Sequence, residues 1–256
     1  MDITAKEQFT KLWQRYFGKA ELPVAFFYTD RSEGVTVAKP PKAEHRCVIA
    51  DIGRTRKGVS LAFNVASVGC FGGKKYLGFT QGFRPNFEYF LSCGIPGELE
   101  GERYKKSPAI VKEVMKNMPA FKAPAEYIVF KRWDMIGKTD DPDVVIFFAS
   151  PDVLAGIFTL ANFDEAEPNG VFAPFAAGCS TIVTHPYLER SAGRPRAVLG
   201  MFDISARPCV PDNVLTIAVP MNKFEKMIAN MEESFLTTQS WSKVKRRIVK
   251  AQKNMD

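Results

Sequence analysis

Residues 23–29 read Pro-Val-Ala-Phe-Phe-Tyr-Thr, and a run of the same character, Val-Ile-Phe-Phe, occupies residues 145–148. Both runs consist mainly of β-branched and aromatic residues and carry no charge, which is typical of a strand buried in a core. The second run matches Val24–Phe27 at an offset of 121 residues. The sequence therefore predicts an α+β fold with two similar halves, each combining a sheet with helices.

Two further matches follow in the same order along the chain. Gly69-Cys70 resembles Gly178-Cys179 at an offset of 109, and the helical segment ending at 116–118 resembles the one ending at 229–231 at an offset of 113. Three ordered matches indicate an internal duplication. The predicted divisions are a first half over residues 1–120, a second half over 121–236 and a basic C-terminal helix or tail over 237–256.

Hydrophobic spacing and turn residues place the other elements. Helices are predicted over 3–17, near 87–91, and over 108–118, 151–161 and 222–235; strands are predicted over 47–50, 59–65, 127–130, 144–148, 197–202 and 214–219. The tail presents Trp241, Val244 and Ile248 on one helical face. That face is short, so we expect a solvated helix laid on the body and dispensable for the fold.

Composition is that of an ordinary globular protein, with 46% hydrophobic and 25% charged residues in a chain of 256. Residues 237–256 contain six Lys or Arg and one Asp, so they carry five of the seven net positive charges. The sequence thus argues against a nucleic-acid-binding body and leaves weak association through the tail. The N-terminus lacks signal-peptide features and no apolar run could span a bilayer, so we expect a cytoplasmic protein without membrane contact.

Five cysteines occur without a C-x-x-C pair, which excludes a zinc ribbon and a ferredoxin-type run. A disulfide framework is not expected, because the number is odd and no secretion signal precedes it. Ligands from distant loops are still compatible with this spacing. The leading hypothesis is a redox or metal-binding protein with an iron–sulfur cluster held by scattered thiolates, Cys47, Cys70 and Cys179 with Cys209 as a further ligand.

The glycine-rich stretch at 69–79 contains one of these thiols, Cys70, followed by Gly72 and Gly73. Glycines let backbone N–H groups approach a cluster sulfur or an anion, so both glycines are candidate cofactor-binding residues. The alternative is a small-molecule or anion-binding module without catalysis, in which this loop and Arg207 form the pocket. A plain turn beside an inert, buried cysteine would produce the same residues.

Catalytic signatures do not define an enzyme class. The chain has no G-x-S-x-G elbow, Walker A or G-x-G-x-x-G motif, and its only imidazoles are His45 and His185. Asp203 and Arg207 stand close enough in sequence to form an ordinary ion pair. The expected partners are therefore an electron-transfer partner or a small-molecule ligand.

The pattern as a whole resembles the uncharacterised family called "domain of unknown function 169". The resemblance rests on Pro23-Val24-Ala25, Cys47 with Ala50 and Gly53, Cys70-Phe71-Gly72-Gly73 followed by Leu77-Gly78-Phe79, Gly178-Cys179, and Ala206-Arg207. It covers residues 8–236 and implies a cytoplasmic prokaryotic α+β protein. It implies no activity and supplies no catalytic residues.

Overall fold

The run at 23–29 forms the strand β1 at the centre of one mixed sheet in the computed structural model, which describes residues 3–39 and 46–253. Among these residues the sheet has the strand order β2-β3-β4-β1-β5-β8-β7-β6. The strands are β1 Val24–Thr29, β2 Thr36–Val37, β3 Leu61–Phe63, β4 Tyr127–Arg132, β5 Val144–Ala149, β6 Val171–Phe172, β7 Ala197–Gly200 and β8 Leu215–Pro220. The α+β prediction is confirmed.

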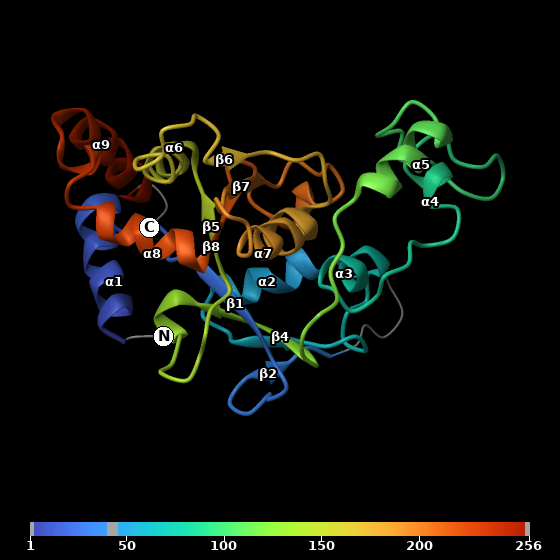
Figure 1. Ribbon diagram of the computed structural model, residues 1–256, viewed down its shortest axis with the longest axis horizontal. Coiled ribbons are helices and arrows are strands. Elements are labelled where there is room, and N and C mark those ends of the chain that lie inside the picture. The colour runs from blue at the N-terminus through green and yellow to red at the C-terminus, as the bar shows by residue number, and fades with distance from the viewer. Residues whose placement is uncertain (1–2, 40–45, 254–256) are drawn as a thin grey trace.

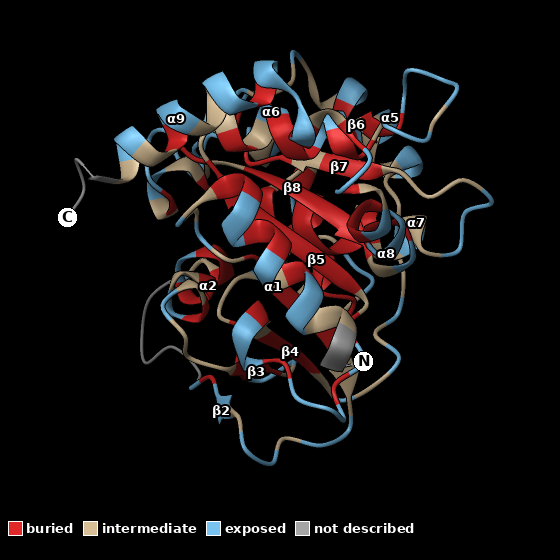
Figure 2. Ribbon diagram, turned by 90° about the vertical axis from the view of Figure 1, so that its left-hand side faces the viewer, coloured by how far each residue is buried: buried red, intermediate tan, exposed pale blue. Residues whose placement is uncertain are grey.

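Helices cover both faces of the sheet, which is why its central strands are apolar throughout. Ala25, Val145 and Phe147 face one core, whereas Val24 and Phe26 face the other. The central strands β5 and β8 are almost wholly buried in Figure 2, whereas β2 at one edge of the sheet is exposed. Within the described ranges, no helix combines the length and the apolar character needed to cross a bilayer.

In Figure 1 the two helical layers lie to the left and right of the sheet. The left layer contains α1 Ile3–Phe17, α6 Pro151–Leu160, α8 Met221–Asn230 and α9 Gln239–Lys253; the right layer contains α2 Val48–Arg56, α3 Phe71–Tyr76 and α7 His185–Glu189. A π-helical turn, η2 Ser180–Thr184, leads into α7. A segment that extends to the far right in Figure 1 contains α4 Phe87–Phe90 and α5 Pro108–Asn117. The short 3-10 turns are η1 Trp133–Met135, η3 Arg207–Cys209 and η4 Phe235–Thr237.

The predicted strand at 47–50 is wrong, because this segment begins α2. Val48, Ile49 and Ile52 are buried while Ala50 is exposed, so the apolar residues follow a helical period. The change matters for the site, since it places Cys47 directly before a helix N-terminus.

The C-terminal helix α9 is part of the core, contrary to the expectation of a solvated and dispensable addition. Trp241 is only 4% exposed, and its indole Nε1–H donates to the carbonyl of Tyr16 over 3.0 Å. A Cβ added to Gly156 would lie 2.4 Å from this ring, so α6 and α9 touch closely there. The basic residues of α9, by contrast, point largely into solvent.

The strand order is symmetric about the pairing of β1 with β5. The strand order is unchanged when each strand of one half is exchanged with its equivalent in the other: β1 with β5, β4 with β8, β3 with β7 and β2 with β6. The strand directions are also preserved, because β2–β3 and β6–β7 are the parallel pairs and the other pairs are antiparallel. β4 lies between β3 and β1, so the symmetric division falls between residues 132 and 144 rather than at 120. Of the three matches, only that between β1 and β5 joins equivalent elements: Cys70 follows β3 whereas Cys179 precedes β7, and α5 precedes β4 whereas α8 follows β8.

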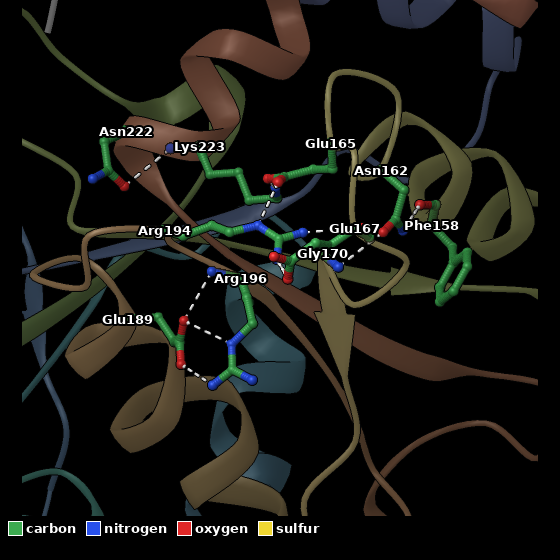
Figure 3. A network of polar contacts seen from close by, with 10 residues as sticks. All are labelled: Phe158, Asn162, Glu165, Glu167, Gly170, Glu189, Arg194, Arg196, Asn222 and Lys223. Atoms are coloured by element: carbon green, nitrogen blue, oxygen red, sulfur yellow. Dashed lines mark hydrogen bonds and ion pairs between the residues drawn. The ribbon is translucent and has the colours of Figure 1, made fainter.

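An ion-pair network fixes the outer end of the second half (Figure 3). The Glu165 carboxylate accepts from Arg194 Nε at 2.6 Å and from Lys223 Nζ at 2.7 Å, and the Lys223 side chain is 4% exposed. Arg196 forms a second pair with Glu189 at 2.7 Å. Because Lys223 belongs to α8, Glu165 to the loop after α6 and Arg194 to the loop before β7, the network ties helix α8 to the two loops that flank β6 and β7.

Candidate functional site

Two of the predicted ligands, Cys47 and Cys70, immediately precede helices on the right-hand layer. Cys47 has an extended backbone before α2, and Cys70 has an extended backbone before α3. The N–H of Gly73 donates to the Cys70 sulfur over 3.4 Å. Unpaired amides at a helix N-terminus favour negative charge, so both sulfurs lie where a thiolate is stabilised by the backbone.

Close packing brings the starts of α2 and α3 together. A Cβ added to Gly73 would lie 2.9 Å from Val68 Cγ1, 3.4 Å from the Cys70 Cβ and 3.8 Å from Val48 Cγ1. Val68 leaves little room for a side chain at 73, and the same position is in ordinary contact distance of Val48, the residue that follows Cys47. The predicted role of Gly73 as a donor is compatible with this packing role.

Cys179 enters the same region from the second half. It is 8% exposed and directly precedes η2. The preceding Gly178 donates its N–H to Asp203 Oδ2 over 3.0 Å, and its absent Cβ would lie 3.0 Å from Ala206 Cβ and 3.8 Å from Ile49 Cγ1. Gly178 thus lies between the start of α2 and the turn that leads to Cys209.

Cys209 is the last residue of η3, in the loop between β7 and β8. Arg207, two residues earlier, does not form the ion pair with Asp203 that its sequence position suggests. Its guanidinium donates to the carbonyls of Val214, of Pro211 at 3.2 Å and of Asp212 at 2.7 Å. Arg207 therefore stabilises this loop, and both of its terminal nitrogens donate to backbone carbonyls.

The thiols of Cys47, Cys70, Cys179 and Cys209 interact with one another. After burial, which is the largest cause, Cys209 helps to raise the pKa of Cys47, Cys47 helps to raise that of Cys70, and Cys70 and Cys47 help to raise that of Cys179. The segments that carry the four predicted ligands pack in one region, because Gly73 approaches Val48, and Gly178 approaches Ile49 and Ala206. Cys93 lies elsewhere, exposed, with its thiol donating to the Gly94 carbonyl over 3.4 Å.

Burial is the main influence on the pKa values of Cys47, Cys70 and Cys179. It raises the pKa of Cys47 from 9.0 to about 11 and raises the pKa values of Cys70 and Cys179, Cys179 most strongly. The amides of Ile49 and Ala50 act in the opposite direction on the Cys47 pKa, but they do not outweigh burial. Without a cation, these thiols are neutral near pH 7, which is unfavourable for a nucleophilic cysteine.

Two other groups border the thiols. Tyr76 of α3 is buried, and burial together with the charges of Cys179, Asp203 and Cys70 raises its pKa. Asp203 holds Gly178 through Oδ2 and accepts from Ser205 through Oδ1. Sequence reasoning singled out Asp203 but missed Tyr76, because an aromatic residue on a helix ordinarily indicates packing.

The imidazoles contribute little to this arrangement. The His185 ring packs edge-on against Phe172, with centroids 6.0 Å apart, and burial lowers its pKa. His45 lies outside the described residues. Across ranges 3–39 and 46–253, no group of three or more His, Cys, Asp and Glu side chains has the arrangement needed for a metal ion.

The spacing of glycines and cysteines that suggested a family also matches a family model, over residues 14–230. The chain belongs to the domain of unknown function 169 family. The family is described as "Uncharacterised ArCR", so membership names no reaction for this domain of unknown function 169 protein. Comparisons with curated proteins and with solved structures found no significant match to the chain.

Proposed function

We propose that this protein is a redox protein that carries an iron–sulfur cluster on Cys47, Cys70, Cys179 and Cys209. The observation that supports the proposal is the close packing of the four separate segments that carry these thiols, three at the starts of helices and one in a turn. Iron–sulfur clusters are held by four cysteine thiolates in their commonest form. When bound, the cluster supplies one-electron transfer.

Electrostatics favour a cation here. Besides burial, which is the largest cause, Cys47, Cys70 and Cys209 each help to raise the pKa of another thiol, because two thiolates close together repel each other. A bound cation removes that repulsion and displaces the protons, so affinity for metal increases with pH. The Gly73 N–H that reaches the Cys70 sulfur at 3.4 Å is the type of donor that tunes a cluster.

The alternative, an anion-binding or small-molecule module built on residues 69–79, has less support. Its positive residue, Arg207, is engaged by three carbonyl oxygens. The Gly73 amide is directed at Cys70, and the amides of Lys74 and Leu77 are used inside α3 and its end. The tail could bind nucleic acid weakly through exposed cations of α9, but nothing in its geometry selects a nucleic acid over solvent.

Iron and acid-labile sulfide content after oxygen-free purification tests the proposal. We expect stoichiometric iron and sulfide in the wild-type protein and in Cys93→Ser, which alters an exposed thiol outside the group. Cys179→Ser should lose both. Absence of iron and sulfide from the wild-type protein, also after anaerobic reconstitution with ferrous iron and sulfide, would refute the cluster.

A further inference from the structure

Hydrogen bonds at the ends of the central strands repeat between the two halves of the sheet. After β4, the N–H of Trp133 donates to the carbonyl of Pro23 over 2.8 Å; after β8, the N–H of Met221 donates to the carbonyl of Asp143 over 3.0 Å. Each bond joins the end of one strand to the residue before its neighbour. The symmetry of the strand order thus extends to individual backbone contacts.

The loops after β3 and β7 repeat in finer detail. Asn64 directly follows β3, whereas Asp203 is the third residue after β7. Both accept through Oδ1 from the N–H two residues later, at 3.1 Å in both loops. Their carbonyls also accept from the N–H three residues later, again at 3.1 Å in both. The two turns correspond at an offset of 139 residues, from 64 to 203.

The same offset relates Cys70 to Cys209, since each cysteine is six residues beyond the turn-forming side chain. The other two thiols also correspond. Cys47 directly precedes α2, which leads into β3, and Cys179 directly precedes η2 and α7, which lead into β7. The match of Cys70 with Cys179 in the sequence analysis therefore paired non-equivalent residues.

Close packing gathers the segments that carry these thiols. A Cβ added to Gly73 would lie 3.4 Å from the Cys70 Cβ and 3.8 Å from Cγ1 of Val48, which follows Cys47. A Cβ added to Gly178, which precedes Cys179, would lie 3.8 Å from Ile49 Cγ1 and 3.0 Å from the Cβ of Ala206, in the turn that leads to Cys209. Each half therefore supplies two of the segments that meet in this region.

We propose that the chain is an internal duplication whose two copies each contribute two thiols, one before and one after strand β3 or β7, to a single, pseudo-twofold cofactor site. This inference rests on the proposed function for the identity of the cofactor, and it specifies the cofactor class: a cluster ligated by four protein thiolates, two from each half. Such a cluster has no open position for a substrate. The site thus exchanges electrons with a partner and does not bind substrate at iron.

Ligand variants test the equivalence of Cys70 and Cys209. In anaerobically reconstituted protein, Cys70→Ser and Cys209→Ser should each lower retained iron and sulfide at least fivefold relative to Cys93→Ser, and to a similar extent. Circular dichroism and the thermal midpoint of the metal-free variants serve as the folding control. Wild-type iron content in Cys209→Ser beside loss in Cys70→Ser would overturn the symmetric site while leaving a cluster in place.

A second measurement uses the unaltered, metal-free protein and does not depend on any cofactor. Limited oxidation with diamide removes two electrons and two protons from two thiols, forms one disulfide and reduces diamide to the hydrazine. Peptide mapping without reduction should find disulfides among Cys47, Cys70, Cys179 and Cys209, with at least one that joins the two halves. Links only within one half, or only to Cys93, would overturn the shared site. A wild-type protein without iron that gives links between the halves would refute the cluster alone.

Discussion

The acidity of Cys47 offers a quantitative test of the thiol site. Burial raises its pKa from 9.0 to about 11 in the metal-free protein. Only thiolate reacts with iodoacetamide, so a shift of two pKa units lowers the reactive fraction at pH 8 by roughly 100-fold compared with a free thiol. We therefore expect alkylation of Cys47 to keep accelerating about tenfold per pH unit up to pH 10, with no plateau near pH 9.

The assay follows alkylation of each cysteine by mass spectrometry in protein stripped of metal, between pH 7 and pH 10. The shape of the pH profile is the decisive readout, because steric shielding slows the reaction equally at every pH. Exposed Cys93 serves as the internal reference. A plateau for Cys47 below pH 8 would contradict the reasoning, since it would reveal a stabilised thiolate and hence a nucleophile in place of a metal ligand.

Three further predictions concern the scaffold. Trp241→Ala should lower the free energy of unfolding by about 4 kcal/mol, the usual cost of deleting a buried tryptophan. Urea denaturation measures this cost, with the exposed Lys243→Ala as the control. A cost below about 1 kcal/mol would show that α9 contributes little to the core. Glu165→Gln should cost about 3 kcal/mol at pH 7 by leaving buried Lys223 without its partner. Because the hydrogen bond from Lys223 lowers the Glu165 pKa below 4.5, this stabilisation is present above pH 4.5 and disappears as the pH falls through the folded-state pKa, so a difference that persists in acid would exclude the ion pair. Gly73→Ala should destabilise by about 2 kcal/mol through overpacking, and an unchanged urea midpoint would show that the chain there relaxes freely.

The central strands could be predicted from sequence because their composition is unambiguous. The run at 23–29 places apolar residues on both faces of a strand, as expected for a strand covered by helices on both sides. The structure has strand β1 at this position, with its residues in both cores. The segment 47–50 is ambiguous from sequence, because its four apolar residues fit a strand as well as a helix. Its helical period emerges only when Ile52 and Thr55, both buried, are included.

The sequence allowed the proposal that the cysteines share one site, but it could not show where in the fold that site lies or which cysteines are equivalent. Cys47 and Cys209 are 162 positions apart, and no local spacing reports that a sheet brings them together. The sequence matches also paired Cys70 with Cys179, because a shared Gly-Cys dipeptide is more visible than the Asx turns at Asn64 and Asp203. These turns are formed by different residue types, so only their hydrogen bonds reveal the correspondence.

Iron K-edge X-ray absorption of the anaerobically purified protein tests the central claim most directly. The account predicts a first shell that contains only sulfur, together with an iron–iron shell from neighbouring metals in one cluster. Because four cysteines supply every terminal ligand, this spectrum should not change when an exogenous ligand such as cyanide is added. A first shell containing nitrogen or oxygen, or iron without an iron neighbour, would contradict a cluster held by Cys47, Cys70, Cys179 and Cys209.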